Sequence, residues 1–185
     1  MSDYPIYSIE SAPAQARPAL QQLQDALGFL PNIAGAMAGS PVLINGFVGL
    51  FQRVHASSLS EAQLQTLLLT NAVANASRWP VAFHSALALQ QGVSAADVDA
   101  MRRGRSLRDA KLDALSTLAR TLIEKRGHLT AADRERFAAA GFSHEQALEV
   151  IAVVAASTIT NYTSNVTQPP IEPPFDRHVW EAPSE

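Results

Sequence analysis

The sequence divides into short apolar segments of helical period, and most of them begin and end at recognisable signals. Alanine and leucine recur at the spacing that places them on one helix face, and no segment shows the convincing alternation of a strand. Several segments begin with a Ser or Thr whose hydroxyl can cap a helix start, followed three residues later by a side chain that can bond back to the backbone amide of that first residue. These pairs are Ser60–Gln63, Ser94–Asp97, Thr130–Asp133 and Ser143–Gln146. Glycines stand where helices should stop, at Gly92, Gly104, Gly127 and Gly141. This pattern predicts an all-α fold.

The spacing of these signals predicts where the helices lie. We expect them over residues 14–28, 41–56, 60–77, 80–91, 94–103, 109–126, 130–140 and 143–165, with a short turn at 31–38. The last of these helices is apolar on all sides, so we expect it to be buried nearly all round, in the centre of a bundle or in a subunit interface.

The chain of 185 residues fits a single domain, 1–185, with a core motif region at 41–105. Four prolines fall within residues 167 to 175 and cannot continue a helix, so we expect 167–185 to form a Pro-rich extended tail. Three of its residues are too apolar for a free tail, which indicates packing on its own subunit or on a neighbour: Phe175, Val179 and Trp180.

Composition excludes several classes of function. A hydrophobic fraction of 47% is typical of a globular protein, and a net charge of −3 with mixed signs disfavours nucleic acid or an anionic membrane as the partner. No apolar run reaches the ~20 residues of a membrane span, and the first residues lack the features of a secretory signal, so we expect a cytoplasmic protein.

The absence of cysteine excludes disulfides, thiolate metal sites and thiol chemistry. The histidines other than His84 share no metal-ligand spacing, and no phosphate-binding glycine loop is present. We therefore expect neither a metal nor another cofactor.

The stretch "LSEAQLQTLLLTNAVANASRWPVAFHSALALQQGVSAADVDAMRRG" resembles the core of the alkylhydroperoxidase D and carboxymuconolactone decarboxylase superfamily. The flanking stretches, "IYSIESAPAQARPALQQLQDALGFLPNIAGAMAGSP" before it and "GHLTAADRERFAAAGFSHEQALEVIAVVAASTITNYTSNV" after it, resemble the longer, peroxidase-related members. The resemblance covers nearly the whole chain. It implies an all-α helical bundle that assembles as a homo-oligomer, with dimer, trimer and hexamer all compatible.

The peroxidase-related members carry a Glu, a Cys-x-x-Cys pair twelve residues later, and a His four residues beyond the second Cys. In this chain the corresponding residues are Gln65, Ser77, Pro80 and His84, so only the histidine remains. A proline cannot act as a resolving nucleophile, and a serine hydroxyl cannot pass through a sulfenic acid. Thiol peroxidase chemistry is therefore excluded.

The decarboxylase branch also lacks the cysteine pair but keeps a histidine on this helix, and "ASRWPVAFHSALALQQGVS" is similar to it. The resemblance implies a pocket for a small molecule, such as a carboxylate or a lactone, with cofactor-free lyase or isomerase chemistry through His84. Four further residues are expected to contribute to substrate binding: Gln65, Ser77, Trp79 and Asn161.

Each of these residues also has a purely structural interpretation. His84 and Asn161 can be buried groups bonded to a neighbouring helix, Ser77 an ordinary helix-end residue, and Trp79 a packing aromatic. The alternative function is therefore a non-catalytic, oligomeric binding or structural protein that retains the fold.

Overall fold

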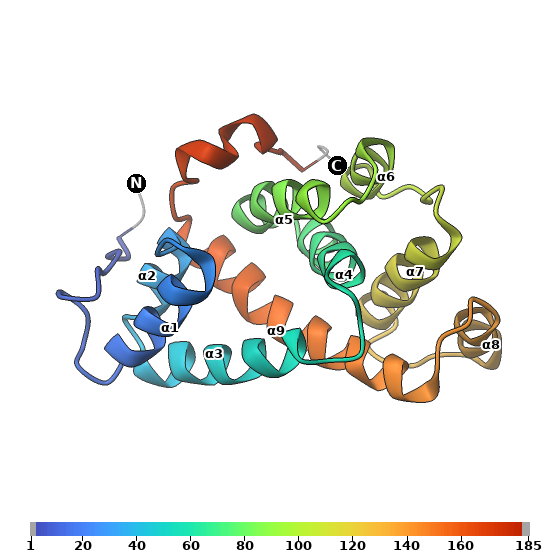
Figure 1. Ribbon diagram of the computed structural model, residues 1–185, viewed down its shortest axis with the longest axis horizontal. Helices are drawn as coiled ribbons and strands as arrows, with labels where there is room; N and C mark the ends of the chain where they lie inside the picture. Colours follow the sequence, from blue (N-terminus) through green and yellow to red (C-terminus); the bar gives the residue numbers. More distant parts are fainter. Residues whose placement is uncertain (1–2, 183–185) are drawn as a thin grey trace.

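The computed structural model describes residues 3–182, and the regular secondary structure in that range is entirely helical (Figure 1). The elements are α1 (Arg17–Leu27), α2 (Asn32–Met37), α3 (Pro41–His55), α4 (Glu61–Ala74), α5 (Arg78–Gln90), α6 (Ala95–Arg102), α7 (Ala110–Glu124), α8 (Ala131–Ala139), α9 (His144–Thr167) and the 3₁₀ helix η1 (Pro173–His178). The all-α prediction is confirmed, and each predicted helix is present. The short turn expected at 31–38 is the six-residue helix α2.

The predicted helix signals operate as expected. Reciprocal capping boxes join Ser60 to Gln63, Thr130 to Asp133 and Ser143 to Gln146 at the starts of α4, α8 and α9. Ser94 caps α6 through the amide of Asp97, but the box is not closed there because the Asp97 carboxylate accepts from the Ser94 hydroxyl and the Arg108 amide. The four predicted stop glycines all have positive φ, between 64° and 88°.

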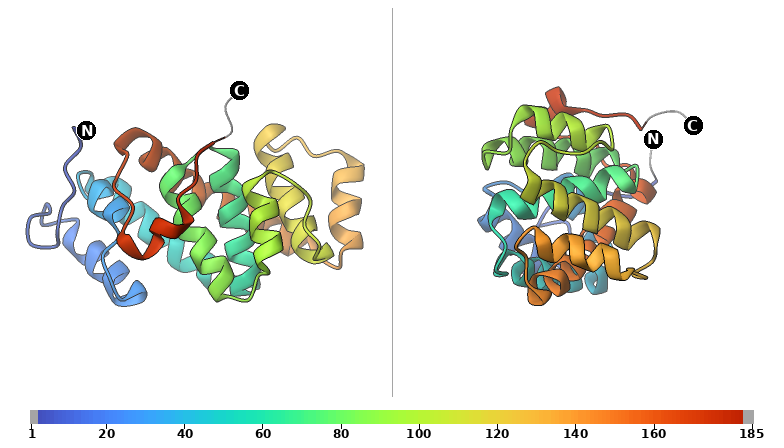
Figure 2. Two further views of the ribbon diagram at one scale, coloured as in Figure 1. Left: turned by 90° about the horizontal axis from the view of Figure 1, so that it is seen from above. Right: turned by 90° about the vertical axis from the view of Figure 1, so that its right-hand side faces the viewer.

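Helix α4 lies at the centre of the molecule and packs against α5, α6, α7 and α9. Figure 2 shows the α4–α5 pair between the N-terminal helices at one end and α7 and α8 at the other. The long helix α9 runs along the molecule and touches α2, α3, α4, α5 and α7. This arrangement brings the start of α5 between the N-terminal helices and the middle of α9.

Two buried apolar clusters meet at this point. One joins α1, α2 and α3 to the start of α5, and includes Leu20, Met37, Ile44, Phe47 and Trp79. The other joins α4, α7 and α9, and includes Leu64, Leu67, Leu115, Val150 and Val153. The candidate site lies between these two clusters, so its walls are held by the packing of both.

Within the single chain helix α9 is not buried all round, so it is not the central helix of the bundle; its burial in a subunit interface stays a prediction. Four of its exposed side chains are large and apolar: Leu148 is 67% exposed, Ile151 50%, Tyr162 60% and Val166 60%. The neighbouring helices leave part of α9 uncovered, and apolar residues on every side of its middle section gave no sign of which side would be open.

The Pro-rich tail packs on its own chain, as predicted. Phe175 and Trp180 are buried, and the guanidinium of Arg102 donates to the carbonyls of His178 and Val179 at 2.8 and 3.0 Å. The tail is not extended throughout, because residues 173–178 form η1. The end of the predicted tail, 183–185, lies outside the described residues.

Candidate functional site

His84 lies on α5 with its imidazole turned towards α4, where Nδ1 is 2.9 Å from Oε1 of Gln65. An amide oxygen can only accept a hydrogen bond, so in this assignment of the Gln65 amide Nδ1–H is the donor. The neutral ring then carries a bare Nε2 with an available lone pair. Gln65 therefore fixes both the orientation and the tautomer of His84.

The imidazole of His84 is held in its neutral form. Only 7% of the residue is exposed. Burial, with a smaller contribution from the charge of His55, lowers the pKa of His84 from 6.5 to about 3. Gln65 offers no negative charge to offset this loss of hydration. At neutral pH His84 is thus a hydrogen-bond acceptor at Nε2.

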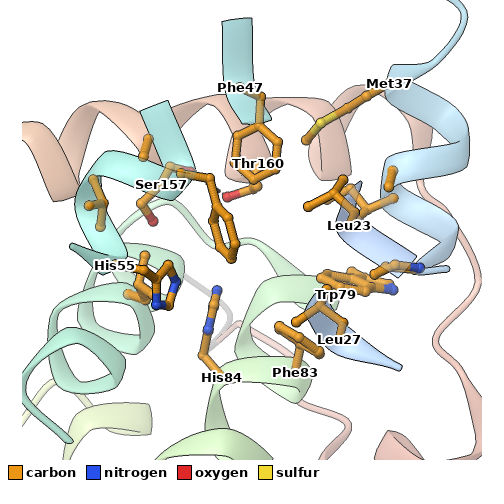
Figure 3. A pocket seen from close by; sticks show the side chains of 17 residues that line it. Leu23, Leu27, Met37, Phe47, His55, Trp79, Phe83, His84, Ser157 and Thr160 are labelled. Carbon is orange, nitrogen blue, oxygen red and sulfur yellow. Dashed lines mark hydrogen bonds between the residues drawn. The ribbon is translucent and has the colours of Figure 1, made fainter. Parts of the chain in front are cut away.

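A small cavity of about 50 Å³ lies directly in front of His84 (Figure 3). Its walls come from α1, α2, α3, α4, α5 and α9, and most of them are apolar: Leu23, Leu27, Met37, Phe47, Phe51, Leu68, Trp79, Phe83 and Ala156 are among the lining residues. Figure 3 shows the imidazole of His84 pointing into this space. No group within residues 3–182 hydrogen-bonds to Nε2 of His84. An acceptor without a protein partner therefore faces an apolar cavity.

Trp79 forms one wall of the same cavity and is fixed from behind by the tail. Its indole Nε1–H donates to Oε2 of Glu172 at 2.9 Å, and Oε1 of Glu172 accepts from the amide of Asn32 at 2.6 Å. Trp79 also stacks on Phe83 with ring centroids 4.9 Å apart. One carboxylate of the tail thus joins the cavity wall to the start of α2.

Ser77 and Asn161 are buried but do not line the cavity. The hydroxyl of Ser77 donates to the backbone carbonyl of Asn161 at 3.1 Å, and the Asn161 amide donates to Ser157 at 3.2 Å. The structure therefore joins these two predicted site residues to each other, across the contact between α5 and α9. Of the five, only His84 and Trp79 border the cavity, and Gln65 touches it through His84.

His55 is a site residue that the sequence reasoning missed. It lines the cavity from the end of α3 and hydrogen-bonds through Nδ1 to Oε1 of Glu61 at 3.0 Å. Its ring also packs against Phe51, with centroids 4.3 Å apart. A histidine and a glutamate six residues apart, flanking the Ser60 helix start, were the available signal.

A surface groove of about 510 Å³ adjoins the cavity. The two spaces share Leu23, Leu27, Phe51 and His55 as wall residues. Gln65 lines the groove rather than the cavity, so it lies between the outer space and His84.

No lysine or arginine of the described part of the chain lines either space. Among residues 3–182, no group of three His, Asp or Glu side chains is placed to hold a metal ion. In the same part of the chain, no helix is both long enough and apolar enough to cross a membrane.

Comparison with known proteins finds no matching family model and no similar curated sequence. Solved structures do match. An uncharacterized peroxidase-related protein from Ralstonia eutropha JMP134, described as an alkylhydroperoxidase AhpD core, superposes with a TM-score of 0.82 at 20% identity, over 94% of each chain. A peroxidase-related protein from Silicibacter sp. TM1040 gives 0.76 at 19% identity, over 94% of this chain and 92% of that one. The chain has the alkylhydroperoxidase D-like fold.

The debrominase Bmp8 has this fold too. It superposes with a TM-score of 0.79 at 21% identity, over 96% of each chain. A cysteine-to-alanine variant of Bmp8 has been solved in complex with 2,3,4-tribromopyrrole, and matches with a TM-score of 0.76 at 22% identity. These likenesses confirm the fold that the sequence resemblance implied. The chain has no cysteine, so thiol chemistry is not available to it.

Proposed function

We propose that this protein binds a small, neutral, largely apolar molecule that donates one hydrogen bond to Nε2 of His84. The observation that carries the proposal is a bare imidazole nitrogen, fixed by Gln65, at the wall of an apolar cavity. Nε2 is accessible from the cavity and has no protein partner among residues 3–182, so a ligand N–H or O–H can donate to it. The pyrrole bound by the Bmp8 variant carries such an N–H.

The same chemistry disfavours the carboxylate or lactone ligands expected from the sequence resemblance. A carboxylate would enter an apolar space that no lysine or arginine lines, at a high desolvation cost. A lactone offers only acceptor oxygens, and Nε2 of His84 is itself an acceptor. Heteroaromatic N–H compounds and neutral phenols fit the site better.

Size limits how such a ligand binds. The cavity of about 50 Å³ exceeds the ~10–15 Å³ that one water needs, but it is smaller than the ~150 Å³ engineered cavity that accepts benzene. A ring can bind if the cavity widens towards the adjoining groove, because Phe51 and His55 line both spaces.

A calorimetric titration with pyrrole and N-methylpyrrole tests the proposal. The two rings have similar shapes, but only pyrrole donates a hydrogen bond. We expect pyrrole to bind wild type more tightly, and His84→Phe to lose that preference. His128→Phe, the same substitution at an exposed histidine outside the cavity, is the matched control. Equal binding of both rings by wild type would refute the role given to His84.

Any catalysis at this site would use His84 as a base. Burial lowers the pKa of His84 to about 3, so the ring is deprotonated at neutral pH and available as a base, although a weaker one than an ordinary imidazole. Cofactor-free lyase or isomerase chemistry through His84 would begin with transfer of a ligand proton to Nε2. Exchange of ligand C–H for deuterium in D₂O, followed by NMR, would detect that step. Exchange that persists in His84→Phe would exclude His84 as the base.

We further propose that the chain assembles as a homo-oligomer through α9. Four large apolar side chains on this helix are at least half exposed in the single chain. Their spacing places them on the same side of the helix, and exposed apolar side chains grouped on one surface are typical of an interaction site. Light scattering on wild type and Ile151→Glu tests this: we expect a dimer or larger assembly for wild type and a smaller species for the variant. A monomeric wild type would refute the proposal.

A further inference from the structure

The cavity in front of His84 and the surface groove beside it have complementary properties. The cavity is nearly all apolar and about 50 Å³ in volume, whereas the groove is about 510 Å³. Ligand sites in proteins usually fall between ~300 and ~1,000 Å³, so the cavity alone is too small and the groove lies within this range. The four shared wall residues make the two spaces neighbours, and movement of Phe51 or His55 would join them.

The groove is lined by apolar side chains and by several carboxamides. The apolar residues include Leu23, Ala26, Leu27, Val48 and Leu87. The carboxamides are those of Gln22, Gln52 and Gln91, which are exposed, and of Gln65, which is buried and bonded to His84. A carboxamide both donates and accepts hydrogen bonds, so the exposed ones suit hydroxyl, ether or amide groups.

The charge of the groove narrows the ligand class further. Glu61 is the one acidic residue among its lining residues, and the carboxylate is hydrogen-bonded to His55. No lysine or arginine lines the groove to balance an anion. A carboxylate in the groove would be repelled by Glu61, whereas a neutral polar group would not.

We propose that the groove is a second subsite for the same ligand, which is elongated: a compact apolar head reaches His84, and a neutral polar chain lies in the groove. This rests on the proposed function, because the head must bind in the cavity for the chain to be placed. Phe51 and His55 form the junction between the subsites, and Glu61 holds His55 in position there. The preferred substrate class is therefore an N–H or O–H ring with a hydroxyalkyl or amide chain.

Three probes test this by calorimetry: pyrrole, a pyrrole carrying a hydroxypropyl chain on the carbon beside the nitrogen, and the corresponding propanoate. We expect the hydroxypropyl compound to bind wild type about tenfold more tightly than pyrrole, because burial of the chain exceeds the cost of ordering it. The propanoate should bind less tightly than the hydroxypropyl compound.

A groove-filling variant supplies the structural control. Ala26 is exposed on α1 and lines the groove but not the cavity, so Ala26→Phe should abolish the tenfold gain and leave pyrrole binding unchanged. Gln21→Phe, at an exposed position of the same helix that does not line the groove, should keep the gain.

The outcomes separate this inference from the proposed function. If pyrrole binds and the hydroxypropyl compound binds no better, or if Ala26→Phe keeps the full gain, the groove is not a subsite and the inference is overturned. If wild type and His84→Phe bind pyrrole equally well, the proposed function itself fails. A tighter propanoate would contradict the charge argument and with it the stated ligand class.

Discussion

Acidification should destabilise this protein through His84. The pKa of this histidine is lowered to about 3 in the folded chain, against 6.5 for an ordinary histidine. Between these values the unfolded chain binds the proton and the folded chain does not, so stability falls as the pH drops below 6.5. Above that pH both states are neutral and there is no effect. At pH 5 this proton binding lowers the free energy of unfolding by about 2 kcal/mol relative to neutral pH, at about 1.36 kcal/mol for each pH unit below 6.5.

Urea unfolding at pH 8 and pH 5 measures this effect. His84→Gln removes the titrating group while keeping a polar side chain, and every other ionisable group is common to both proteins. Between pH 8 and pH 5 the free energy of unfolding of wild type should fall by about 2 kcal/mol more than that of the variant. His128→Gln, at an exposed position, should behave as wild type. If wild type and His84→Gln lose the same stability between the two pH values, the neutral, buried state of His84 is wrong.

Three further changes should have distinct effects. Gln65→Glu places a carboxylate beside the imidazole and should raise the pKa of His84, measured by NMR titration; an unchanged pKa would contradict the contact. Glu172→Gln removes the charge-assisted hydrogen bond to Trp79 and should shift the tryptophan fluorescence and lower Tm, whereas unchanged values would show that the tail does not fix this wall. Ser77→Ala should cost about 1 kcal/mol in stability and leave pyrrole affinity unchanged, and a loss of affinity would place Ser77 in the binding site.

The helices could be predicted from the sequence because their signals are local. Capping pairs such as Ser60–Gln63 and stop glycines such as Gly92 act within a few residues of each helix end. The apolar spacing between them specifies the buried faces. The exposed side of α9 could not be predicted in this way, since it depends on which helices pack against it and not on its own composition.

The candidate site was only partly predictable. The contact between Gln65 and His84 follows from two positions on paired helices and was suggested by the family motif. The part played by His55 depends on how α3 and α5 are placed around the cavity, and that of Glu172 on the path of the tail. Both depend on how elements far apart in the sequence are placed around the cavity, for which periodicity gives no signal.

The central claim is that Nε2 of His84 is an unprotonated acceptor that a ligand donor occupies. Long-range ¹H–¹⁵N NMR of histidine-labelled protein at neutral pH tests it directly, because the ¹⁵N shift separates protonated from bare ring nitrogens. We predict that Nδ1 of His84 carries the proton, that Nε2 is bare, and that only the Nε2 signal shows a large shift when pyrrole is added, with no such change for N-methylpyrrole. A protonated Nε2 in the free protein, or an Nε2 signal that responds equally to both rings, would contradict the account.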